Sequence, residues 1–263
     1  MTVIRLLMFV VLCLPLCASA GTNYWGHIQA LGKFNTPKGN PQMESYLRSL
    51  SPEEMLQAAR EYSEYAQSTF PEERWAEASG TLLVILALYG PEEGAFPADR
   101  LAALLAGVTD NREGRFFRES MVRLLRQTYW RQLTTEQRRE SRGRFLAVVT
   151  NKKSPAQLRA LACRELELAV AEDYRQVIHA DRNVRPLRTD KTKWSNLNNL
   201  IRSGEVRLDA ETRKSLKSVR DEIANITPTL ATLSQDAAES PEVKDRAQTA
   251  LKTFADLPVV PEQ

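Results

Sequence analysis

The chain has 263 residues, of which 43% are hydrophobic and 26% charged, the composition of an ordinary globular protein. This composition excludes a disordered tail, a collagen-like fibre and a multi-span membrane protein, and three cysteines are too few for a disulfide scaffold. A formal net charge of +3 is too small to indicate a nucleic-acid partner by itself.

Residues 1–20 have the features of a secretory signal peptide. Arg5 supplies a positive charge, residues 6–16 form an apolar run, and Ala20 ends a small-x-small pattern that signal peptidase can cleave before Gly21. The apolar run is shorter than the roughly 20 residues that a membrane-spanning helix needs. We therefore expect an exported protein with no transmembrane segment after cleavage.

The cysteines refine this expected location. Leu16 stands directly before Cys17, where lipoprotein processing requires a small residue, so the sequence argues against a lipid anchor. Cleavage leaves Cys163 alone, without a partner for an internal disulfide. The absence of cysteine pairs favours a bacterial periplasmic or secreted protein.

The mature chain begins with residues 21–41, for which we expect an extended N-terminal arm because they are rich in glycine and proline. From residue 42 the sequence predicts a succession of helices, each roughly 12–18 residues long. Ser51 with Glu54 predicts a capping box. Further helix starts are predicted at the residue groups 70–73, 97–99, 134–136, 154–155 and 240–242.

These helices fall into two predicted regions, 42–182 and 210–257, the second followed by a tail at 258–263. The intervening residues 183–209 are polar and basic and contain Pro186 and Gly204, so we expect an irregular connection. A short helix around residues 194–201 is the one regular element predicted there.

Four of the predicted helices share an order of side chains, in which a large residue, a small residue and a leucine are spaced by four. The large residues are separated by 41, 42 and 85 positions, which indicates a repeat of about 42 residues built from helix pairs. The four sets are Trp75, Ser79 and Leu83; Phe116, Ser120 and Leu124; Leu158, Ala162 and Leu166; and Val243, Ala247 and Leu251.

The sequences of residues 240–251 and 154–162 resemble that of the second helix of HEAT-type repeats. This resemblance covers about residues 70–257 with one gap, and it implies an all-α fold: a right-handed α-solenoid of degenerate HEAT-like helix pairs. An irregular helical bundle with a chance spacing is the alternative.

The sequence contains none of the motifs that are typical of catalytic sites or of sites for metal ions, cofactors or nucleotides. We expect His27 and His179 to be surface or hydrogen-bonded residues, and Cys163 to be a small buried residue. The sequence thus favours a non-enzymatic protein without catalytic, cofactor or metal residues, and an enzyme with an unrecognised site is the alternative.

The charge distribution is uneven. Residues 42–99 hold eleven acids and three bases, a net charge of −8, and residues 112–153 hold four acids and twelve bases, a net charge of +8. The simplest interpretation is solvated helix faces with ion pairs between neighbouring helices. A second interpretation is a basic face for binding, whose candidate residues are Arg115, Arg118, Arg123, Arg126, Arg138, Arg139 and Arg142.

We therefore expect an exported helical-repeat scaffold that binds another protein or an envelope component. The alternatives are an arginine-rich face for an anionic lipid or a cell-wall polymer, and head-to-tail self-association between acidic and basic regions. We do not expect a nucleic-acid partner, because export separates the protein from most nucleic acid and few aromatic residues lie among the arginines.

Overall fold

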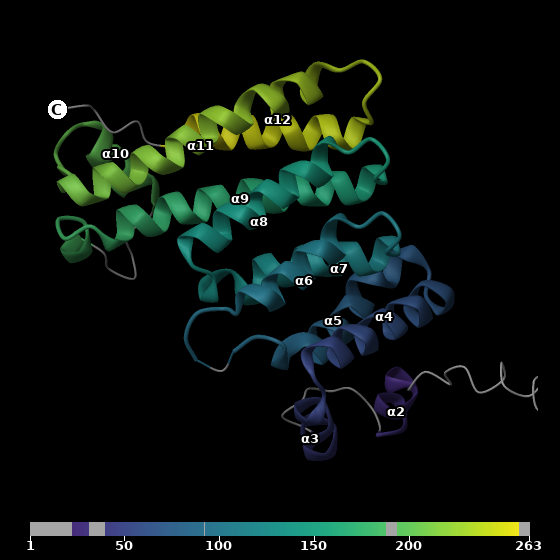
Figure 1. Ribbon diagram of the computed structural model, residues 1–263. Helices are drawn as coiled ribbons and strands as arrows, with labels where there is room; N and C mark the ends of the chain where they lie inside the picture. The colour runs from purple at the N-terminus through teal and green to yellow at the C-terminus, as the bar shows by residue number, and fades with distance from the viewer. Residues whose placement is uncertain (1–22, 32–39, 92, 188–193, 258–263) are drawn as a thin grey trace, which may run out of the picture. The chain divides into compact units, whose positions relative to one another are not determined.

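The computed structural model describes residues 23–31, 40–91, 93–187 and 194–257. These residues form eleven α-helices, labelled α2 to α12 in Figure 1, and no strand. The expected all-α class is thus confirmed. The chain forms two compact units, the first ending at Tyr89 and the second beginning at Gly90. The predicted signal peptide and the tail 258–263 lie outside the described residues.

The first unit contains four α-helices: α2 (Tyr24–Ala30), α3 (Pro41–Ser49), α4 (Pro52–Thr69) and α5 (Trp75–Ile85). Trp25 on α2 packs edge-on against Tyr62 on α4 with ring centroids 4.6 Å apart, and its backbone N–H donates to Glu61 Oε2 at 2.8 Å. Tyr62 in turn donates its hydroxyl to the carbonyl of Ala78 on α5 at 2.8 Å. These contacts join α2, α4 and α5.

Two predictions for the first unit have different outcomes. The capping box of Ser51 and Glu54 is present at the start of α4. The extended arm predicted for residues 21–41 is wrong for residues 24–30, which form α2. Asn23 caps this helix by accepting from the N–H of Gly26 at 2.7 Å, and burial of Ile28 stabilises a segment whose glycine content argues against a helix.

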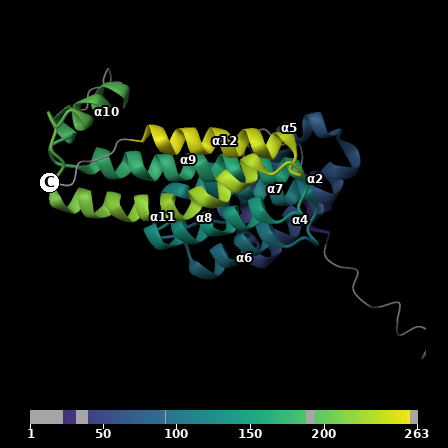
Figure 2. The same cartoon turned by 90° about the horizontal axis from the view of Figure 1, so that it is seen from above.

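The second unit contains the helices that carry most of the arginines. They are α6 (Ala98–Thr109), α7 (Arg115–Leu124), α8 (Thr135–Thr150), α9 (Ala156–Ala180), α10 (Trp194–Arg202), α11 (Ala210–Gln235) and α12 (Pro241–Asp256). Helix α9 contacts α7, α8, α11 and α12, and α6 contacts α7 and α8. Figure 2 shows α9 and α12 beside each other in one layer, with α8 and α11 in the adjacent layer.

Three of the four predicted side-chain stripes lie in the core of this unit. In the fourth, on α5 of the first unit, Ser79 is buried while Trp75 and Leu83 are half-buried. All three stripe residues of α7 and of α9 are buried, and in α12 Val243 and Ala247 are buried while Leu251 is half-buried. Helices α9 and α11 have 25 and 26 residues, longer than expected. The sequence of α9 has no glycine or proline that would end it earlier, and α11 continues through Pro228. The predicted short helix in the connection is present as α10.

Four connections in the second unit begin with the same turn. In each, an acid or asparagine follows the end of a helix, and its side-chain oxygen accepts the backbone N–H two residues later. These residues are Asp110, Asn151, Asp181 and Asp236, with distances of 2.9, 3.0, 2.7 and 2.9 Å. In two of these connections an arginine, Arg118 or Arg159, donates Nε to the carbonyl ten residues earlier, at 3.0 and 2.7 Å. The side chains therefore fix how α6 joins α7 and how α8 joins α9.

Among the described residues, no helix combines the length and the apolar character that a membrane crossing requires.

Candidate functional site

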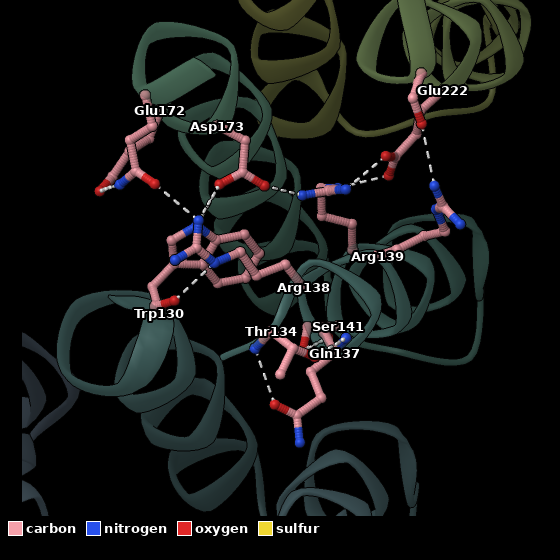
Figure 3. Close-up of polar contacts among 12 residues, drawn as sticks. Trp130, Thr134, Gln137, Arg138, Arg139, Ser141, Glu172, Asp173 and Glu222 are labelled. Carbon is pink, nitrogen blue, oxygen red and sulfur yellow. Dashed lines mark hydrogen bonds and ion pairs between the residues drawn. The ribbon is translucent and has the colours of Figure 1, made fainter. Parts of the chain in front are cut away.

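A cluster of buried charges joins α8, α9 and α11 (Figure 3). At its centre, Asp173 on α9 accepts hydrogen bonds from the indole of Trp130 at 3.1 Å, from Arg138 at 2.9 Å, and from Arg142. Arg142 also donates Nε and Nη2 to the two carboxylate oxygens of Glu222 on α11, at 2.5 Å each. One guanidinium therefore bridges carboxylates from two different helices.

Arg142 remains charged in this cluster although it is only 4% exposed to solvent. Burial lowers the pKa of Arg142, but its hydrogen bonds and charge interactions with Glu222 and Asp173 outweigh this effect and raise the pKa above its ordinary value. The planar guanidinium can bind both carboxylates with fixed geometry. The cluster thus fixes the position of α11 against α8 and α9 through buried ion pairs.

Arg126 extends the cluster from the short π-helical segment Leu125–Tyr129. Its Nη2 lies 2.5 Å from Glu172 Oε2, and its guanidinium carbon lies 5.7 Å from the ring centroid of Trp130. The guanidinium carbons of Arg138 and Arg142 each lie 5.9 Å from the same ring. The indole of Trp130 therefore has three arginines around it, at distances where cation–π attraction is favourable.

Arg118 lies outside this cluster, in the first turn of α7. It is 3% exposed and donates to the carbonyl of Val108, to Asn111 Oδ1 and to Ser154 Oγ, each at 3.0 Å. Burial lowers the pKa of Arg118, and the charge of Asp110 counteracts part of this shift. Arg118 therefore links two successive connections through neutral acceptors.

The remaining predicted arginines are more accessible. Arg115 pairs with Glu119 on the same helix at 2.9 Å, and Arg123 is half-buried. The side chain of Arg139 is 50% exposed, and its Nη2 donates to Ser218 Oγ on α11 at 3.1 Å. The structure thus brings together Arg126, Arg138, Arg139 and Arg142 beside α9 and α11. It places Arg115, Arg118 and Arg123 on α7.

A groove beside Arg139 and Arg142 lies between α8 and α11. It has a volume of about 410 Å³, with Leu146 and Ile226 among its apolar lining residues. A Cβ atom on Gly143, which also lines it, would meet no other atom within 4 Å, so this part of the groove is open. Its polar lining residues are Arg139, Arg142, Ser218, Asp221, Glu222 and Asn225.

The residues of the enzyme alternative lie in different environments. The ring of His27 packs on Tyr46 with centroids 4.3 Å apart, in the first unit, and His179 lies near the end of α9 in the second. Cys163 is buried, as predicted, and burial raises the pKa of its thiol to about 12, so it is not a thiolate at neutral pH. In the described part of the chain, histidine, cysteine and acidic side chains form no group that could hold a metal ion.

Sequence reasoning did not identify the acids that complete this site. Asp173 and Glu222 lie 31 and 80 residues from Arg142, so no local spacing connects them. The same holds for Glu239, which binds Arg159 at 2.6 Å across 80 residues. The sequence analysis thus identified seven arginines but not the residues that they bind.

Comparison with known proteins yields no match to a family model, to a curated protein or to a solved structure.

Proposed function

We propose that this protein is an exported, non-enzymatic α-solenoid of HEAT-like helix pairs that binds another protein in the groove between α8 and α11. Export rests on the signal-peptide features of residues 1–20. The non-enzymatic assignment is supported by the charged groups around Trp130, since the arginines and carboxylates of this cluster are engaged with one another.

The solenoid proposal is supported by a shared register of 41 residues in the second unit. Thr109 and Thr150 each donate a hydroxyl to the carbonyl four residues earlier, at 3.0 and 3.1 Å. Asp110 and Asn151, and then Arg118 and Arg159, also make equivalent contacts at this separation. Helix pairs that use the same connection repeatedly are expected in a helical-repeat protein.

The observation that carries the binding proposal is the open, partly apolar groove. Leu146 and Ile226 offer apolar surface, and Arg139 and Asp221 offer opposite charges at exposed positions. A fitting partner segment presents an apolar side chain for the groove, an acid for Arg139 and a base for Asp221. We therefore expect a protein partner rather than a small, uniformly charged ligand.

The substitution Gly143→Phe fills this groove without a predicted backbone clash, because nothing lies within 4 Å of the added Cβ. The equivalent control is Gly80→Phe on α5, where a Cβ also has open space. The chain from Gly21 onward is first used with a crosslinker to recover its partner from its own envelope fraction. The purified partner is then titrated against the wild-type chain and both variants.

We expect Gly143→Phe to weaken binding at least tenfold, which is the effect of losing about 1.4 kcal/mol of contact free energy. Gly80→Phe is expected to bind as the wild type does, and circular dichroism checks that both variants stay helical. The proposal fails if the wild type recovers no other protein, or if the two variants bind the partner equally well.

A further inference from the structure

The second unit has another basic region in addition to residues 112–153. Across residues 174–187 and 194–220 there are nine bases and four acids, a net charge of +5. The end of α9, helix α10 and the start of α11 lie at the same end of this unit in Figures 1 and 2. Segments that are far apart in the sequence thus form one positively charged end of the unit.

A buried carboxylate holds the two connections at this end together. Asp181 is 1% exposed and accepts the N–H of Asn183 at 2.7 Å and the N–H of Asp209 at 2.8 Å. The amide of Asn183 donates to the carbonyl of Arg207 at 2.7 Å. Residues 182–187 and 205–209 are therefore fixed against each other by hydrogen bonds, which places the bases they carry in a set arrangement.

The bases on this framework are accessible to solvent. The side chain of Arg182 is 82% exposed and its nearest acid, Asp209, lies 3.9 Å away. Arg185, Arg207, Lys214 and Lys217 are also exposed. These five bases contrast with Arg142, whose side chain is 4% exposed between two carboxylates. We call Arg182, Arg185, Arg207, Lys214 and Lys217 the basic end.

An exposed apolar side chain follows Arg185 by two positions in the sequence. Leu187 is 40% exposed, and only Leu168 is comparable among the large hydrophobic residues that the structure describes. It directly follows Arg185 and Pro186 in the short 3-10 turn Arg185–Leu187. Basic residues around an exposed apolar side chain are typical of surfaces that attach to anionic lipid, because charge attracts the protein and the apolar group enters the interface.

We propose that the basic end binds the surface of a membrane that contains anionic phospholipid. Arg182, Arg185 and Arg207 contact the headgroups from the two fixed connections, Lys214 and Lys217 do so from α11, and Leu187 enters the interface. An acidic protein would satisfy the bases, but it gives no reason for an exposed leucine two residues after Arg185. This attachment does not depend on the groove at Gly143, so the two proposals can be tested separately.

The test is co-sedimentation of the chain from Gly21 onward with phosphatidylcholine vesicles, with and without phosphatidylglycerol, at low and high salt. Starting at Gly21 leaves out the apolar run of residues 6–16, which would itself bind lipid. The test variant neutralises the basic end with Arg182→Gln, Arg185→Gln, Arg207→Gln, Lys214→Gln and Lys217→Gln. A matched control removes five exposed bases elsewhere in the same unit, with Arg112→Gln, Arg131→Gln, Arg144→Gln, Lys152→Gln and Lys153→Gln.

We expect binding only to vesicles with phosphatidylglycerol, and weaker binding at high salt. Each base near an anionic surface contributes about a fivefold factor to partitioning, so the test variant should lose at least about a hundredfold while the control loses much less. Leu187→Ser should weaken binding about threefold to tenfold without changing the response to salt. Gly143→Phe should leave lipid binding unchanged.

Three results would overturn the proposal. The first is that the wild-type chain sediments equally with both kinds of vesicle, or with neither. The second is an equal loss of affinity in the test and control variants, which would mean that total charge and not the basic end determines binding. A salt-sensitive dimer that forms without vesicles and disappears in the test variant would assign the basic end to a second copy of the chain. Circular dichroism of both variants checks that they are folded.

Discussion

The second unit contains two groups of bases with opposite surroundings. On α8, Arg138 and Arg142 are directed into the protein, where they bind Asp173 and Glu222. At the basic end, Arg182 and Arg185 are exposed to solvent. The difference shows that a dense run of arginines in a sequence does not establish a basic surface, because acids far along the chain can neutralise it inside the fold.

The two groups should also differ in energetic role. A buried charge is unfavourable unless it is paired, so loss of one partner leaves the other charge uncompensated. An exposed charge keeps its water and loses little when a neighbour is removed. The buried group should therefore determine stability, and the exposed group should determine association.

The largest expected effect is that of Arg142→Met. This substitution leaves Asp173 and Glu222 without the guanidinium that bridges them, and we expect a loss of about 3–5 kcal/mol in the free energy of unfolding. Arg139→Met on the same helix is the control, because its side chain is half exposed, and it should cost less than about 1 kcal/mol. Urea unfolding followed by circular dichroism measures both, and equal losses would contradict the contrast.

The second prediction concerns two glutamates whose pKa values shift in opposite directions. Hydrogen bonds from Arg159 lower the pKa of Glu239, whereas burial raises the pKa of Glu165. The folded state with a lowered pKa at Glu239 binds fewer protons than the unfolded state. The stability from Glu239 is therefore present above its ordinary pKa of 4.5 and is lost as the pH falls through the lowered value.

For Glu165 the sign is reversed. With the pKa of Glu165 raised, the folded state binds more protons than the unfolded state. The contribution of Glu165 to stability is therefore most favourable below its ordinary pKa of 4.5 and declines as the pH rises through the raised pKa. At pH 7, Glu239→Gln should cost about 1–3 kcal/mol and Glu165→Gln should stabilise the protein. The effect of Glu239→Gln should shrink as the pH falls below 4.5 toward the lowered pKa of Glu239, whereas the effect of Glu165→Gln should shrink at higher pH, as the pH falls from the raised pKa of Glu165 to 4.5. Urea unfolding across this pH range measures them, and parallel pH profiles would rule out the opposite shifts.

Much of the fold was predictable because its signals are local. Capping residues such as Ser51 and Ser240 act within one helical turn, and α4 and α12 begin where they predict. The short helix α10 was also predicted from its own sequence. Residues 24–30 were assigned wrongly because Trp25 packs on Tyr62, 37 positions away, and this packing outweighs an unfavourable local composition.

The candidate site was only half predictable, for a related reason. Charge counting found the arginines, but their acidic partners come from other helices and carry no local signal. One informative pattern was present in the sequence. Val108-Thr109-Asp110 and Val149-Thr150-Asn151 are 41 residues apart, and an arginine follows each at the same distance. This pattern aligns Phe117 with Leu158, whereas the stripe spacing aligned Phe116 with it.

A smaller effect is expected at two glycines inside helices, Gly143 on α8 and Gly107 on α6. Gly143 has open space at its Cβ position, so Gly143→Ala should stabilise α8 by about 0.5–1 kcal/mol through the higher helix propensity of alanine. At Gly107 on α6, a Cβ would lie 2.9 Å from the ring of Phe117. Gly107→Ala should therefore gain less or be destabilising, depending on how far that ring can move. Thermal unfolding compares the two, and a larger gain at Gly107 would contradict this prediction.

The smallest change in stability is expected at the basic end. Lys214→Gln and Lys217→Gln remove exposed ammonium groups from α11. Both residues lie beyond the first turn of the helix and are exposed to solvent, so the pair should change the free energy of unfolding by no more than about 0.5 kcal/mol. Urea unfolding of the double variant beside Arg142→Met measures this effect. If the lysine variant is destabilised by several kcal/mol, these bases are structural, and their exposure does not mark a surface reserved for binding.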